Sequence, residues 1–163
     1  MNRAVLLLGG NLNNPRENFK KSCTEINKNI GTISQKSSLY ESEAWGFESE
    51  YLFLNQVIIV NTKLNAFDLL KATQEIERKI GRKEKTQSQI YSSRLIDIDI
   101  LFFNNDIIET KDLIVPHAKL HLRNFTLLPL KELIPEFIHP VLNKSIIWLT
   151  DNSIDNNQCL KLS

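Results

Sequence analysis

The clearest chemical pattern in the sequence is a pair of aspartates, Asp97 and Asp99, within the alternating stretch 95–103. Alternation of this kind predicts a strand, in which successive side chains point to opposite faces of the sheet. The two carboxylates therefore share one face, and the isoleucines between them share the other. Like charges side by side are unfavourable in a sheet unless a cation lies between them. Magnesium often uses one or two carboxylates together with substrate phosphates, so the pattern favours a magnesium site over a solvated acidic face.

Basic residues accompany this strand. Arg94 precedes it and Arg123 follows later, while a cluster closes the preceding helical pattern and its loop: Arg78, Lys79, Arg82, Lys83 and Lys85. Guanidinium groups bind phosphate oxygens in pairs, so carboxylates with nearby arginines suit a magnesium-polyphosphate and phosphoryl-type transfer. Taken alone, such a charged run is more often solvated surface.

Polar and aromatic residues elsewhere could complete a site. His117 follows Val115-Pro116 and could donate to a phosphate oxygen or move a proton, although a loop histidine bonded to backbone is an equally good interpretation. Phe53 and Phe125 could stack on a flat heterocycle whose edge the amide of Asn55 reads. Phenylalanine is usually buried, so a core role for both rings is the alternative.

The elements that must position these residues follow from local patterns. Asn14 and Asn65 are typical N-caps, and Gly31 and Gly81 typical ends, of two helices. Alternating and β-rich stretches predict strands over 3–8, 32–45, 51–64 and 95–103; Asn104-Asn105 predicts a hairpin into 106–108, and a helix broken by Pro129 follows over 122–133. The order β-α-β-β-α-β predicts a ferredoxin-like α+β sandwich with an added hairpin strand, C-terminal helices and helices on one sheet face.

Length and composition set the limits. A chain of 163 residues fits one domain, 1–163, with a polar stretch over 150–163 that we expect to be weakly ordered. The net charge of +1 gives no support to a general nucleic-acid or membrane-surface role. No stretch approaches the roughly 20 apolar residues of a membrane span. Two cysteines far apart favour reduced thiols and a cytoplasmic protein.

Taken in order, these pieces resemble the 6-hydroxymethyl-7,8-dihydropterin pyrophosphokinases, from Arg3 to about Pro140. The motifs that carry the resemblance are Gly9-Gly10-Asn11-Leu12, Leu54-Asn55, Gln74-x-x-Glu77 with Gly81-Arg82, Arg94-x-x-Asp97-x-Asp99, and Val115-Pro116-His117 with Arg123-x-Phe125. The sequence departs from the family's usual pattern at Tyr91-Ser92-Ser93, where many members carry Trp-Gly-Pro, and at Phe53, where tyrosine is common.

The resemblance implies transfer of diphosphate from ATP to the pterin hydroxymethyl group, with release of AMP, in folate biosynthesis. It implies a monomer without nucleic-acid or membrane partners, and two Mg²⁺ ions on Asp97 and Asp99, with Asp97 also helping to take the hydroxyl proton. Loops 42–50 and 83–93 would close over the substrates. The implied catalytic residues are Arg82, Arg94, Asp97, Asp99 and His117; the ATP-binding residues are Leu70, Gln74, Glu77, Arg82, Arg94, His117 and Arg123; the pterin-binding residues are Ser42, Trp45, Phe53, Asn55, Tyr91 and Phe125.

Three alternatives stay open at this point. One is another Mg-ATP-dependent transferase with a different hydroxyl acceptor, and one is an inactive homologue. The third is a ferredoxin-like RNA-binding module, which would stack bases on strand aromatics. Asp97 and Asp99 argue against that module, because they would repel a phosphate backbone in the absence of metal.

Overall fold

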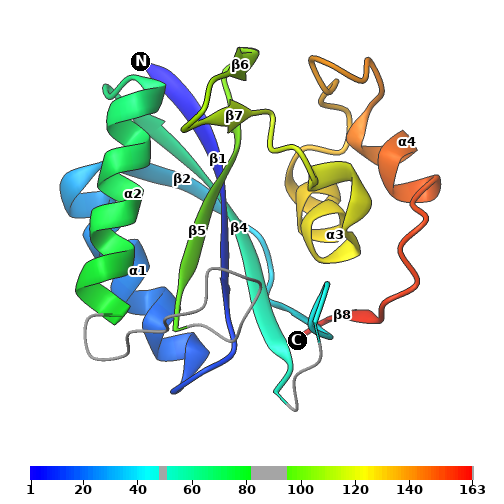
Figure 1. Ribbon diagram of the computed structural model, residues 1–163, viewed down its shortest axis with the longest axis horizontal. Helices are drawn as coiled ribbons and strands as arrows, with labels where there is room; N and C mark the ends of the chain where they lie inside the picture. Colours follow the sequence, from blue (N-terminus) through cyan, green and yellow to red (C-terminus); the bar gives the residue numbers. More distant parts are fainter. Residues whose placement is uncertain (48–50, 82–94, 163) are drawn as a thin grey trace.

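An antiparallel sheet forms the centre of the molecule (Figure 1). The computed structural model describes residues 1–47, 51–81 and 95–162. Within these residues the strands are ordered β5-β1-β4-β3-β8, and β2 also pairs with β4. Their bounds are β1 Asn2–Gly10, β2 Gly31–Lys36, β3 Tyr40–Ser42, β4 Phe53–Thr62, β5 Asp97–Phe103 and β8 Cys159–Lys161. The α+β class and the chain order predicted from the sequence are confirmed, with β3 as an addition.

Helices cover both faces of this sheet, whereas the sequence pattern predicted cover on one face only. The helices α1 (Pro15–Asn29) and α2 (Ala66–Gly81) pack against one core, with Leu6 of β1 at its centre. The 3₁₀ turn η1 (Leu120–Leu122), α3 (Asn124–Leu133) and α4 (Ile146–Asp151) pack against a second core on the opposite face. Strand β1 is therefore buried without interruption over residues 4–8.

The predicted helix starts are confirmed by their capping bonds. The side chain of Asn14 accepts from the backbone N–H of Glu17 at 3.3 Å, and that of Asn65 accepts from Asp68 at 2.8 Å. Each bond satisfies one of the backbone donors that a helix leaves unpaired in its first turn. In α3, Pro129 lies inside the helix without ending it.

Two strand predictions need correction. The stretch 32–45 is not one strand: β2 and β3 both pair with β4, and Ser37 between them accepts the N–H of Val57 on its hydroxyl at 3.0 Å. The residues after Asn104-Asn105 do not return along β5. Strand β6 (Ile108–Glu109) pairs instead with β7 (Ile114–Val115) in a separate small sheet, so the hairpin lies one element later.

The tail also differs from expectation. The polar composition of 150–163 predicted weak order, but Cys159–Lys161 form β8, which pairs with β3 at the edge of the central sheet. Composition missed this strand because its stability comes from a partner more than a hundred residues away, and local propensity does not record such a pairing. Among the residues that the structure describes, no helix is both long and apolar enough to cross a membrane.

Gly31 and Gly81 differ in the space around them, which gives a matched test of the fold. A Cβ on Gly31 would lie 2.0 Å from the carbonyl oxygen of Asn61, whereas no described atom lies within 4 Å of a Cβ on Gly81. We expect Gly31→Ala to lower the free energy of unfolding by about 3 kcal/mol or more, because backbone must move. Gly81→Ala should leave it unchanged or raise it by up to about 1 kcal/mol. Urea denaturation of both variants tests this, and equal effects would contradict the close approach.

Candidate functional site

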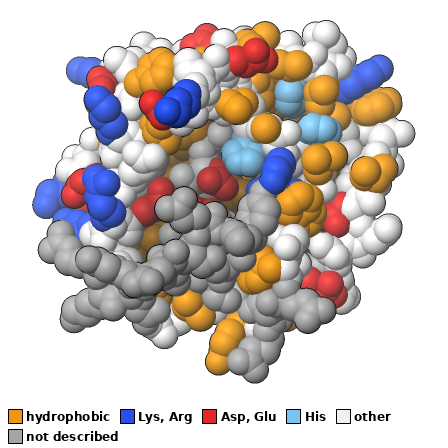
Figure 2. Space-filling view, in the orientation of Figure 1, with side chains coloured by type: hydrophobic (Ala, Val, Ile, Leu, Met, Phe, Trp, Pro, Cys, Tyr) orange, Lys and Arg blue, Asp and Glu red, His pale blue; other side chains and the backbone are white. Residues whose placement is uncertain are grey.

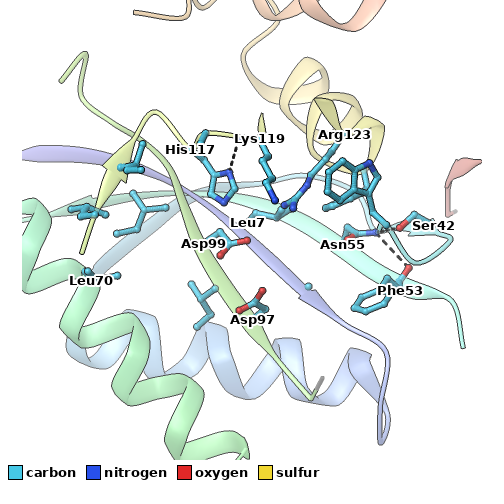
Figure 3. Close-up of a pocket in the computed structure, with 18 of the residues that line it drawn as sticks. Leu7, Ser42, Phe53, Asn55, Leu70, Asp97, Asp99, His117, Lys119 and Arg123 are labelled. Carbon is cyan, nitrogen blue, oxygen red and sulfur yellow. Dashed lines mark hydrogen bonds between the residues drawn. The ribbon is translucent and has the colours of Figure 1, made fainter. Parts of the chain in front are cut away.

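A cavity of about 530 Å³ opens on the α3 side of the sheet. Figure 2 shows acidic, histidine and basic side chains meeting near the middle of one face of the molecule. Figure 3 shows the same kinds of residue around the cavity. Ten of the residues singled out from the sequence line it: Ser42, Trp45, Phe53, Asn55, Leu70, Asp97, Asp99, His117, Arg123 and Phe125.

The cavity begins where the second core ends along the strands. Leu101 of β5 and Val57 of β4 are fully buried in that core. Two positions back on the same faces stand Asp99 and Asn55, and both line the cavity. Side chains two positions apart in a strand share a face of the sheet. The backbone pairing that orients Leu101 and Val57 toward the core therefore also orients Asp99 and Asn55 toward the cavity.

Negative charge is concentrated at the start of β5. Asp97 and Asp99 lie opposite Gly9 and Leu7 of β1, so both carboxylates are held on one edge strand. Glu77 of α2 contacts Asp97. Burial, and then the neighbouring charges of Asp97 and Asp99, raise the pKa of Glu77 to about 9, so this carboxyl stays protonated near pH 7. The charges of the two aspartates contribute to this rise, and a cation beside them would reduce their repulsion.

The donor set fits magnesium in a particular way. Within the described ranges, no group of three or more His, Cys, Asp or Glu side chains has the arrangement of a complete metal site. Two carboxylates alone are what Mg²⁺ commonly takes from a protein when phosphates and waters supply its remaining ligands. Asp97 and Asp99 therefore suit a metal that arrives with a polyphosphate.

His117 stands on the opposite side of the cavity and is held by two backbone contacts. The backbone N–H of His117 donates to the carbonyl of Leu101 at 3.0 Å. The ring Nδ1 of His117 accepts from the backbone N–H of Lys119 at 3.2 Å (Figure 3). Burial, and then the positive charge of Arg123, lower the pKa of His117 to about 4. The ring is thus neutral near pH 7 with its proton on Nε2, so it can donate a hydrogen bond to an anion without carrying charge.

Arg123 joins the charged part of the cavity to its aromatic part. The side chain is buried, and its guanidinium lies 4.4 Å from the ring centroid of Trp45 and 5.4 Å from that of Phe125. Lys119 lies 5.6 Å from the same Trp45 ring. Aromatic faces attract cations, most strongly when water is excluded, which stabilises this buried guanidinium.

The orientation of Asn55 is set by β3. Its Nδ2 donates to the hydroxyl of Ser42 at 2.8 Å and to the carbonyl of Tyr40 at 3.2 Å. The amide nitrogen is therefore committed to the protein, and Oδ1 is the atom that can accept from a ligand. With Phe53 beside it, Asn55 suits a flat ring whose edge carries N–H donors.

Some predicted residues are not brought to the cavity. Gln74 is exposed, and neither it nor Glu77 is among the described residues that line the cavity. Lys79 and Arg78, from the basic cluster, make surface ion pairs with Glu25 and Glu75. Arg82, Tyr91 and Arg94 lie outside the described residues, as do the whole loop 83–93 and residues 48–50 of the loop 42–50.

Other lining residues received no individual role at the site in the sequence analysis. They are Leu7, Gly9, Glu43, Phe47, Lys111, Asp112, Leu113, Ile114, Ala118 and Lys119, together with Ile98 and Ile100 from the far side of β5. Lys119, two residues after His117, could have been found from its position. The stretch 111–114 carried no signal, because its place depends on the β6–β7 hairpin folding beside β5.

Known proteins resemble this chain in sequence and in fold. Residues 5–135 match the family of 7,8-dihydro-6-hydroxymethylpterin-pyrophosphokinase (HPPK). The 2-amino-4-hydroxy-6-hydroxymethyldihydropteridine pyrophosphokinase of Bacillus subtilis is 36% identical over 133 residues, which cover 81% of this chain and 78% of that one. The enzyme of the same name from Aquifex aeolicus is 37% identical over 146 residues, covering 90% and 89%.

A solved structure supports the fold. Wild-type HPPK-DHPS of Plasmodium falciparum superposes with a TM-score of 0.74 at 20% identity, over 92% of this chain. The chain spans only 44% of that longer protein. At this identity the likeness concerns the fold alone.

The lowered pKa of His117 makes stability depend on pH. The unfolded chain binds a proton at this histidine near pH 6.5 and the native chain only near pH 4, so the free energy of unfolding falls as the pH drops through this window. Between about pH 7 and about pH 5, we expect the free energy of unfolding of the wild type to fall by roughly 2 kcal/mol more than that of His117→Gln. Urea titrations at both pH values measure the difference. An identical loss in the two proteins would contradict the buried, neutral ring.

Proposed function

Because the chain belongs to the 7,8-dihydro-6-hydroxymethylpterin-pyrophosphokinase family, we infer that it transfers a diphosphate group from ATP to the hydroxymethyl group of 6-hydroxymethyl-7,8-dihydropterin. The products are AMP and the pterin diphosphate, in folate biosynthesis. The observation that carries the proposal is one cavity lined by the carboxylates of Asp97 and Asp99, the cations of Lys119 and Arg123, and the amide of Asn55 with the rings of Phe53 and Phe125.

Asp97 and Asp99 are the proposed ligands of Mg²⁺, and the family resemblance suggests two ions with ATP. When bound, the metal neutralises phosphate charge and aligns the phosphates for in-line displacement. The pKa of Glu77 supports this role in part: burial raises it most, the charges of Asp97 and Asp99 raise it further, and a bound cation would offset those two charges.

The pterin ring is proposed to bind between Phe53 and Phe125, with its N–H edge on the carbonyl oxygen of Asn55. Ser42 supports this arrangement by holding the amide nitrogen of Asn55 at 2.8 Å. Trp45 forms a further wall through its contact with Arg123. Tyr91 is kept as a proposed pterin residue from the family resemblance.

The transfer itself needs alignment and charge stabilisation more than covalent chemistry. The hydroxymethyl oxygen forms a bond to the β-phosphorus, the bond between the β-phosphorus and the oxygen that bridges it to the α-phosphorus breaks, and AMP leaves with that oxygen and the bonding pair. Asp97 is the proposed acceptor of the hydroxyl proton. Arg123, a buried positive charge, and His117, a neutral ring with its proton on Nε2, are the proposed partners of the phosphate oxygens.

Further residues are proposed to bind the nucleotide. Leu70 lines the cavity on the far side of β5 and is proposed to contact the nucleotide, together with Gln74, Glu77, Arg82 and Arg94. We further propose that residues 1–163 act as a single, monomeric domain in the cytoplasm, a location that the free thiols of Cys23 and Cys159 suit.

The direct test is formation of AMP and pterin diphosphate from Mg-ATP, with and without 6-hydroxymethyl-7,8-dihydropterin. We expect pterin-dependent AMP from the wild type and a loss of about 1000-fold or more in kcat/KM for the double variant Asp97→Asn with Asp99→Asn, because the metal loses its protein ligands. Asp106→Asn, an exposed residue after the same strand, is the matched control and should keep wild-type activity.

The products decide between the functions. ADP in place of AMP would refute diphosphate transfer and point to a phosphotransferase. AMP formed with another hydroxyl compound but not with the pterin would refute the acceptor. Retained activity in the double variant would refute the proposed metal ligands.

A further inference from the structure

The last part of the chain contacts two elements that line the cavity, α3 and β3. Residues 153–162, which we call the C-terminal strap, lie beyond residue 135, where the match to the family ends. In Figure 1 this segment runs from α4 past the start of α3 to β8 at the edge of the sheet. It contributes no residue to the cavity lining among the described residues, so any effect on the site passes through its contacts.

One end of the strap holds the first residue of α3. The backbone N–H of Asn124 donates to the Asp155 carboxylate at 2.8 Å, and the Asn124 amide donates to the carbonyl of Asp155 at 2.9 Å. The hydroxyl of Ser153 donates to the side-chain oxygen of Asn124 at 2.7 Å. Three hydrogen bonds thus fix Asn124, which lies directly between Arg123 and Phe125.

This contact replaces a cap that the helix sequence does not provide. The N-cap of α3 is Arg123, whose side chain has donors and no acceptor, so it cannot satisfy a first-turn N–H. Asp155, which is 31 positions after Asn124 in the chain, provides the acceptor. Its negative charge is favourable at a helix N-terminus.

The other end of the strap holds β3. Cys159 pairs with Ser42 in the β3–β8 ladder, and the N–H of Glu43 donates to the carbonyl of Gln158 at 3.4 Å. Ser42 and Glu43 both line the cavity, and Ser42 orients Asn55. The strap therefore links the start of α3, which carries Arg123 and Phe125, to β3, which orients Asn55.

We propose that Asp155 is a positioning residue for the pterin subsite, acting through Asn124 on Arg123 and Phe125. The kinetic part of this inference rests on the proposed function. Asp97 and Asp99 stand on β5, outside the contacts of the strap, so loss of the Asp155 carboxylate should disturb the pterin side of the cavity and leave the metal side in place.

The variants are Asp155→Ala, which removes the acceptor, and Asp155→Asn, which keeps an acceptor oxygen of the same size. We expect Asp155→Ala to raise KM for the pterin about tenfold, equivalent to about 1.4 kcal/mol, with KM for ATP within about twofold of wild type. Asp155→Asn should recover most of the loss. The matched control is Asp151→Asn, an exposed aspartate whose contact is a 4.0 Å surface ion pair with Lys131; it should behave as wild type.

A spectroscopic readout separates this inference from the proposed function. Trp45 and Trp148 are the two tryptophans of the chain. In a Trp148→Phe background, the emission of Trp45 reports its contact with Arg123, and Asp155→Ala should shift it while Asp151→Asn should not. A shift without any pterin-dependent AMP from the wild type would refute the proposed function and keep the positioning role. Wild-type pterin KM and unshifted emission in Asp155→Ala would overturn the inference, as would an equal rise in both KM values.

Discussion

Repulsion between carboxylates at the start of β5 is the constraint to which the rest of the site responds. Asp97 and Asp99 share a face of an edge strand, and burial together with their charges raises the pKa of Glu77 beside them, so that it adds no third charge near pH 7. Positive groups stand across the cavity at Arg123 and Lys119. The result is an acidic wall opposite a basic wall, an arrangement that a metal-bound polyphosphate would complete by supplying a cation to the first and anions to the second.

The basic wall has a consequence for His117. Burial and the charge of Arg123 keep this ring neutral, so it serves the site as a hydrogen-bond donor whose tautomer is set by the N–H of Lys119. A second cation beside a buried arginine would cost free energy in a low-dielectric cavity. A neutral ring can donate a hydrogen bond to a phosphate oxygen without this cost. The histidine and the arginine can therefore stand close together.

Local sequence patterns predicted what depends on local structure. Alternation in 95–103 placed Asp97 and Asp99 on one face, and Asn14 and Asn65 marked the helix starts. Two features that the patterns missed depend on partners far away in the sequence. Strand β8 pairs with the edge that β3 offers, and the N–H of Asn124 at the start of α3 has its acceptor on Asp155. Periodicity and capping rules describe neighbours along the chain, so they could not reveal a cap supplied from the tail.

The same distinction separates the two parts of the site. Asp97 and Asp99 stand on β5, and the pairing of β5 with β1 fixes the position of each carboxylate. The geometry of the acidic wall therefore depends on the central sheet. Arg123 instead stands where a loop becomes a helix, and it contacts Trp45 and Phe125 while lowering the pKa of His117. A displacement of this one side chain would alter the aromatic subsite and the positive charge opposite β5, while Asp97 and Asp99 would keep their places on that strand. The first turn of α3 therefore has its largest effect on the aromatic subsite, and a contact that fixes this turn acts there more than on the two carboxylates.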